Sequence, residues 1–136
     1  MWTHEESIEI DATPARVWAV FADVHGWKRW NAGIEQIQLH GPFATGTTFT
    51  MQPPGTDAFV SSLIAVDEPR AFTDETVIDE TRVIVDHRID ALSPHRVKVT
   101  YATQITGPEA AAIGPQVTGD FGDVLRALKK IVEEAG

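Results

Sequence analysis

The sequence predicts an α+β domain in which one strand, two short helices and a series of further strands precede a long C-terminal helix. Three observations support this prediction. Apolar and polar residues alternate with a period of two in several runs between residues 3 and 106. Turn-forming residues separate the later runs by short distances, which favours antiparallel pairing of successive strands. Beyond residue 116 the apolar spacing changes to that of an α-helix.

Length and charge limit the classes of protein to consider. A chain of 136 residues fits one domain, here residues 1–136. The net charge of -9 disfavours contact with phosphate backbones, so nucleic acid is not an expected partner. No stretch approaches the roughly 20 apolar residues that span a bilayer, and cysteine is absent. We therefore expect a cytoplasmic protein that is not embedded in a membrane, without a metal site or cofactor.

The first elements are a strand and a short helix. THEESIEI at 3–10 alternates, which places His4, Glu6 and Ile8 on one face of a half-buried strand. Thr13 then has the position of an N-cap, and Pro14 that of the first helical residue.

A connector, DVHGWKRWN at 23–31, holds two of the four tryptophans. Asp23 is predicted to cap a second short helix that extends through Trp30, before a strand near 35–39. Trp18, Phe21, Trp27 and Trp30 would supply large apolar rings to close one end of a core. For Trp27 the sequence leaves packing and ligand contact open.

Five further strands are predicted at 47–51, 58–66, 71–77, 82–92 and 96–106. Alternation in the last two places apolar residues inward together with His87, Tyr101 and Thr103. The acidic runs DEPR and DETVIDE are interpreted as a solvated hairpin face.

The C-terminal segment is predicted to be a helix whose apolar side includes Phe121, Leu125 and Leu128 and which ends near Ala135. IGPQ at 113–116 is expected to break or kink the helix that EAAAI begins. Gly119 and Gly122 indicate either an irregular helix start or space beside the sheet.

The order of these elements, and their local residues, resemble the START-like, helix-grip superfamily (SRPBCC). IEIDATPARVWAVFADVHGWKRWN resembles its opening motif, and GTTFTM, VDEPRAF, DHRI and LRALKKIVE resemble later segments. The resemblance covers nearly the whole chain, is nearest to the polyketide cyclase/dehydrase-like members, and departs at 107–122, which is richer in glycine and proline. It implies a curved seven-stranded antiparallel sheet around a long C-terminal helix, as in START and Bet v 1-like proteins.

The resemblance also implies a function: binding of a hydrophobic or aromatic small molecule, lipid or polyketide-like, in a cavity between the sheet and the last helix. The protein would act as a monomer or weak homodimer. One alternative is a polyketide cyclase/dehydratase-type enzyme, and another is an interaction module like the chaperone-activator branch. The residues expected at the ligand are Trp27, Phe49, Met51, Val85, His87, Val99, Tyr101, Val117, Phe121, Gly122 and Leu125.

Three polar residues are candidates for proton transfer in the enzyme alternative. His87 is either a ligand-orienting or proton-transferring group, or a satisfied core histidine. Tyr101, the only tyrosine, offers a hydroxyl on the neighbouring strand. Glu6 would be a buried acid or base beside Tyr101, or an exposed charge if the first strand frays before Ser7.

Overall fold

The computed structural model describes residues 1–134 and contains one seven-stranded antiparallel sheet. The strand order is β1-β7-β6-β5-β4-β3-β2, so the first and last strands are neighbours. The strands are β1 (Trp2–Ile10), β2 (Gln36–Leu39), β3 (Thr48–Gln52), β4 (Phe59–Asp67), β5 (Ala71–Ile78), β6 (Thr81–Ser93) and β7 (Arg96–Thr106). The predicted fold class is confirmed, and each predicted strand overlaps an observed one.

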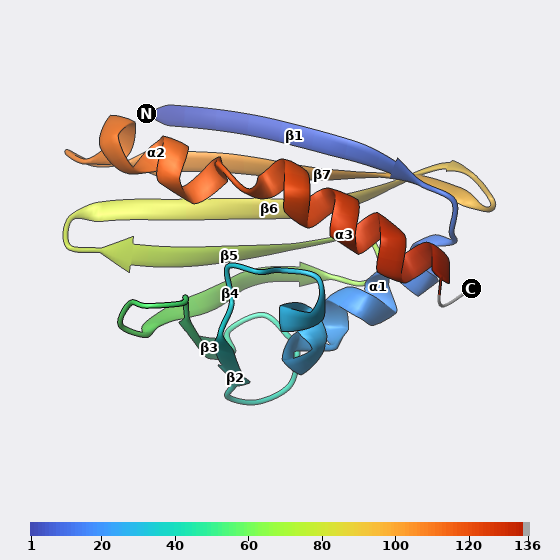
Figure 1. The fold of residues 1–136 in the computed structure, drawn as a ribbon, viewed down its shortest axis with the longest axis horizontal. Coiled ribbons are helices and arrows are strands. Elements are labelled where there is room, and N and C mark those ends of the chain that lie inside the picture. The colour runs from blue at the N-terminus through green and yellow to red at the C-terminus, as the bar shows by residue number, and fades with distance from the viewer. Residues whose placement is uncertain (135–136) are drawn as a thin grey trace.

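The helices lie on one side of this sheet. They are α1 (Pro14–Ala22), the 3-10 helix η1 (Val24–Arg29), α2 (Ala110–Thr118) and α3 (Phe121–Glu134). Figure 1 shows α3 crossing the long strands β6 and β7 diagonally, while α1 lies near the C-terminal end of α3. The predicted end of the last helix near Ala135 lies outside the described residues.

The two connector helices differ in how they begin. The Thr13 side chain accepts a hydrogen bond from the Arg16 backbone N–H at 3.2 Å, as the predicted N-cap requires. Asp23 occupies the predicted N-cap position of the second helix, but its side chain does not make the expected cap hydrogen bond. The Asp23 carboxylate instead accepts a hydrogen bond at 2.9 Å from Nη2 of Arg29, six residues later in the chain.

The rings of this region form a buried aromatic cluster. Trp18, Phe21, Trp27 and Trp30 are all buried, and the Trp27 Nε1–H donates to the Phe21 carbonyl at 2.9 Å. A buried indole N–H needs such a partner, and this hydrogen bond fixes the orientation of the buried Trp27 ring. The concentration of tryptophan in residues 23–31 therefore has a structural role.

The helix that contains Pro115 corrects one expectation. Helix α2 continues through IGPQ without a break, and the interruption comes later, at Gly119 and Asp120. Proline removes one helical hydrogen bond, and its ring crowds the carbonyl four residues earlier, but the helix is not broken here. The Thr118 hydroxyl donates to the Gly114 carbonyl at 3.1 Å, which adds a hydrogen bond in this turn. The irregular helix start that Gly119 indicated thus lies between α2 and α3.

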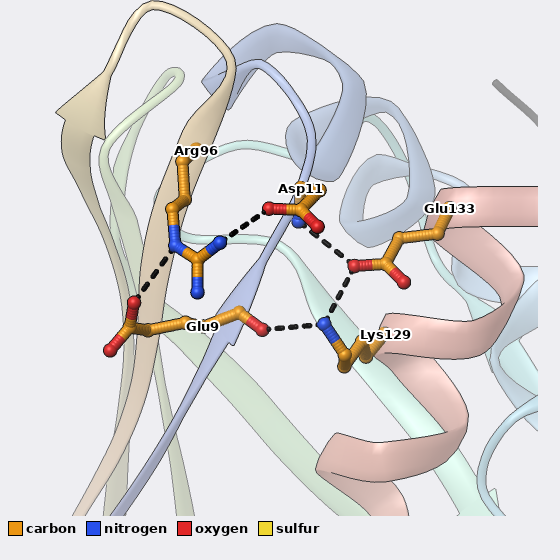
Figure 2. Close-up of polar contacts among 5 residues, drawn as sticks. All are labelled: Glu9, Asp11, Arg96, Lys129 and Glu133. Atoms are coloured by element: carbon orange, nitrogen blue, oxygen red, sulfur yellow. Dashed lines mark hydrogen bonds and ion pairs between the residues drawn. The ribbon is translucent and has the colours of Figure 1, made fainter.

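The C-terminal end of α3 is joined to the sheet by polar contacts (Figure 2). Lys129 Nζ donates to the Glu9 carbonyl at 3.0 Å and to the Glu133 carboxylate at 2.7 Å. Glu133 also accepts from the Asp11 backbone N–H, and Arg96 bridges Glu9 and Asp11. These contacts fix one end of the helix over the end of β1, whereas α2 covers the opposite end of that strand (Figure 1).

Candidate functional site

A cavity of about 660 Å³ lies between the inner face of the sheet, helix η1 and the helices α2 and α3. Its volume is within the range of small-molecule sites, about 300–1,000 Å³. Most of its wall is aromatic or aliphatic: Trp27, Trp30, Ile34, Phe49, Met51, Phe59, Phe72, Ile78, Val83, Val85, Ile113, Val117, Phe121 and Val124. The cavity therefore offers mainly apolar contact.

Eight of the eleven residues expected at the ligand line this cavity: Trp27, Phe49, Met51, Val85, His87, Tyr101, Val117 and Phe121. The structure places the other three elsewhere. Val99 and Leu125 are almost fully buried in the closed core, between the sheet and α3. A side chain at Gly122 would meet Glu6 and Arg126, so this glycine faces away from the cavity.

His87 lies on the inner face of β6, as alternation predicts, and it is buried. Its Nδ1 is 3.2 Å from the Phe72 carbonyl oxygen, which can only accept, so Nδ1 carries the proton and Nε2 is an acceptor. The Phe72 ring stacks on the imidazole, with ring centres 4.0 Å apart. Burial lowers the pKa of His87 to about 3, so the ring is neutral at physiological pH.

Asp74 was not identified from the sequence, and its position corrects the interpretation of DETVIDE as a solvated face. On β5 it lies on the same face as Phe72 and Thr76 and lines the cavity. Its side chain is only 16% exposed, and Asp74 Oδ2 is 3.9 Å from His87 Nε2. Burial raises the pKa of Asp74 from 3.8 to about 7. The inward alternation of 72, 74 and 76 was the signal available in the sequence.

Tyr101 completes the polar part of this wall from β7. It pairs with His87 in the strand register, and the two rings meet edge to face at 4.5 Å. Burial raises the pKa of the Tyr101 hydroxyl, and the nearby Asp74 and Asp120 carboxylates raise it further. The hydroxyl therefore stays protonated and can serve as donor or acceptor.

Glu6 does not belong to this group, although it is the register partner of Tyr101. Strand β1 is continuous from Trp2, so the proposed fraying is absent. The Glu6 carboxylate is 2.7 Å from His4 Nε2, and its side chain is 32% exposed. It is not among the residues that line the cavity.

A second carboxylate, Asp120, lines the cavity at the interruption between α2 and α3. Partial burial raises its pKa, and the negative charges of Asp123 and Glu6 add to the effect. A side chain at Gly33 would come within 3.1 Å of both Asp120 Oδ2 and Asn31 Oδ1. The glycine therefore permits the loop after η1 to approach this carboxylate closely.

Comparison with known proteins identifies the family. The family described as "Polyketide cyclase / dehydrase and lipid transport" matches residues 1–133. The chain belongs to this family. A search of curated proteins finds no match to the sequence.

Solved structures similar to this member of the polyketide cyclase/dehydrase family share its fold. One is norcoclaurine synthase from Thalictrum flavum in complex with dopamine and hydroxybenzaldehyde, with 17% identity, TM-score 0.79, and coverage of 99% of this chain and 88% of that one. Another is a START superfamily protein from Mycobacterium smegmatis, with 14% identity, TM-score 0.78, and coverage of 98% of this chain and 99% of that one. A third is the Zhui aromatase/cyclase from Streptomyces sp. R1128, with 15% identity, TM-score 0.78, and coverage of 97% of this chain and 93% of that one. The predicted START-like, helix-grip resemblance is thus confirmed.

The described residues of this family member also bear on metals and membranes. In residues 1–134, no three or more histidine, aspartate or glutamate side chains are grouped so that they could hold a metal ion. Over the same range, no helix is long and apolar enough to cross a membrane. The titratable side chains that line the cavity are Asp74, His87, Tyr101 and Asp120.

Proposed function

We propose that this protein binds a hydrophobic or aromatic small molecule, lipid or polyketide-like, in the cavity between the sheet and the C-terminal helices. The cavity itself is the observation that carries the proposal: about 660 Å³ with a mainly aromatic and aliphatic wall. A cavity filled by side chains would have favoured the interaction-module alternative instead. Membership of a family that includes lipid transport supports the same proposal.

The arrangement of the rings favours a flat ligand. Trp27, Phe72 and His87 form a column, with ring centres 5.7 Å and 4.0 Å apart and planes inclined by 24° and 8°. The Phe49 ring stands edge-on to Trp27. Aromatic groups associate favourably in both stacked and edge-to-face geometry, so these rings can contact a planar ligand.

The experiment is displacement of an environment-sensitive hydrophobic dye, compared between two variants of β6. Val85 lines the cavity, so Val85→Phe should reduce its volume and weaken dye binding by about tenfold or more. Ile84 lies on the opposite face of the strand, so Ile84→Phe is the matched control and should bind as wild type does. Unchanged dye binding by a folded Val85→Phe protein would refute the cavity as the site. Native mass spectrometry of freshly purified protein would reveal a ligand that co-purifies.

A second function, a cyclase/dehydratase-type enzyme, is favoured by the Asp74–His87 pair. At neutral pH a carboxylic acid with a pKa near 7 can donate or accept a proton, and the neutral His87 can accept a hydrogen bond from the substrate at Nε2. Both groups border the cavity, so a substrate bound there could contact them. With a synthetic poly-β-ketone substrate analogue, Asp74→Asn should retain binding and lose turnover. Absence of turnover by the wild-type protein would count against this second function.

A further inference from the structure

The charged groups of the cavity are all of one sign. Its wall includes the carboxylates of Asp74 and Asp120, and no lysine or arginine lines it within the described part of the chain. A ligand carboxylate or phosphate would therefore meet negative charge and no cationic partner. The same wall would favour a ligand that carries a positive charge.

Within residues 1–134, the ion-pair contact of the Asp74 carboxylate is with a histidine and with no lysine or arginine. The polar group facing it is His87 Nε2, at 3.9 Å. Because His87 donates its only N–H to the Phe72 carbonyl, Nε2 presents a lone pair rather than a proton. The carboxylate is thus buried and borders the cavity, and no lysine or arginine among residues 1–134 lines that cavity.

We propose, as a refinement that rests on the proposed function, that the ligand is an aromatic or apolar compound with a basic amine, whose ammonium donates to Asp74 inside the cavity. An ammonium has three donors. Asp74 and the neighbouring His87 Nε2 are acceptors for two of them, and the Tyr101 hydroxyl oxygen is a third acceptor on this wall. The aromatic rings that line the cavity can hold the apolar part of the ligand.

Titration of Asp74 gives the proposal a signature. Burial raises the pKa of Asp74 to about 7, and binding of a cation would lower it. The other titratable groups of the wall behave differently: His87 stays neutral above about pH 3, Tyr101 stays protonated, and Asp120 has a raised pKa but lies at the helix interruption. An ammonium ligand should therefore bind about tenfold more weakly at pH 6 than at pH 8, because Asp74 is mostly protonated at pH 6.

The test uses three probes with the same ring system: naphthylmethylamine, naphthylmethanol and naphthylacetate. At pH 8, titration calorimetry should show the amine binding about tenfold or more tightly than the alcohol, and the carboxylate most weakly. Asp74→Asn should reduce the preference for the amine to within about threefold while it retains affinity for the alcohol. Asp90→Asn removes one negative charge from an exposed position of β6 and is the matched control.

The outcomes distinguish failure of the amine proposal from failure of the proposed ligand-binding function. If none of the probes binds, the proposed function fails and the amine specificity fails with it. If the alcohol binds and the amine has no advantage, or if Asp74→Asn keeps the advantage, the cavity binds ligands but the amine proposal is wrong. The pH series uses wild-type protein, so the proposal can be tested even if the Asp74→Asn protein misfolds. An amine affinity that is constant from pH 6 to pH 8 would overturn the proposal.

Discussion

Replacement of Asp74 by asparagine should change how stability depends on pH. The folded state raises the pKa of this carboxyl from 3.8 to about 7, so between these values the folded protein binds a proton that the unfolded chain does not. Stability therefore falls as pH rises through this window and stays low above it. The size of the effect is about 4 kcal/mol at 1.36 kcal/mol per pKa unit. Asparagine has nearly the same shape and no charge to bury.

The expected result is a difference in unfolding free energy, Asp74→Asn minus wild type, that increases by about 4 kcal/mol between pH 4 and pH 8. Urea unfolding at constant ionic strength measures it, after co-purified ligand has been removed by unfolding, dialysis and refolding. Asp90→Asn, at an exposed position, should show a nearly constant difference. If the Asp74→Asn difference also stays constant within about 1 kcal/mol, Asp74 is not buried as the structure indicates.

Two other substitutions test the neighbouring parts of the structure. His87→Leu removes a group whose pKa is lowered from 6.5 to about 3. Relative to wild type, the variant should therefore gain stability as pH falls from 6.5 towards 3, and urea unfolding would measure this. A difference in unfolding free energy that does not change with pH would contradict a buried neutral imidazole. Trp30→Ala truncates a buried ring and should lower the unfolding free energy by about 3–5 kcal/mol, measured by thermal or urea unfolding. Leu92→Ala, at an exposed position, should lower it by less than about 0.5 kcal/mol. If the two substitutions have equally small effects, the structural role of Trp30 is refuted.

Much of the fold could be predicted because its signals are local. Alternation in β6 and β7 fixes which side chains face inward, and Pro14 after Thr13 marks a helix start whatever the tertiary structure is. The break between α2 and α3 could not be placed in this way. Proline disfavours a helix interior but does not forbid it, and helix α2 continues past Pro115 to Thr118.

The candidate site was predicted in part, and its errors have two different causes. His87 and Tyr101 were found because each lies among apolar residues on a long alternating strand. Asp74 was missed because it lies in a run of acidic and polar residues, where charge suggests solvent. Val99 and Leu125 face inward as expected, but only packing in three dimensions shows that the space above them is closed.

The two unusual groups of the cavity act on stability in opposite directions. Between about pH 4 and pH 6.5, rising pH destabilises the fold through Asp74 and stabilises it through His87, so the two effects nearly cancel. Above pH 7 only the cost of ionised Asp74 remains, about 4 kcal/mol, which is a large share of the roughly 5–15 kcal/mol that stabilises a typical domain. Asparagine would fill the same space without this cost. Stability therefore does not explain an aspartate at position 74, whereas a cationic ligand that binds its ionised form does.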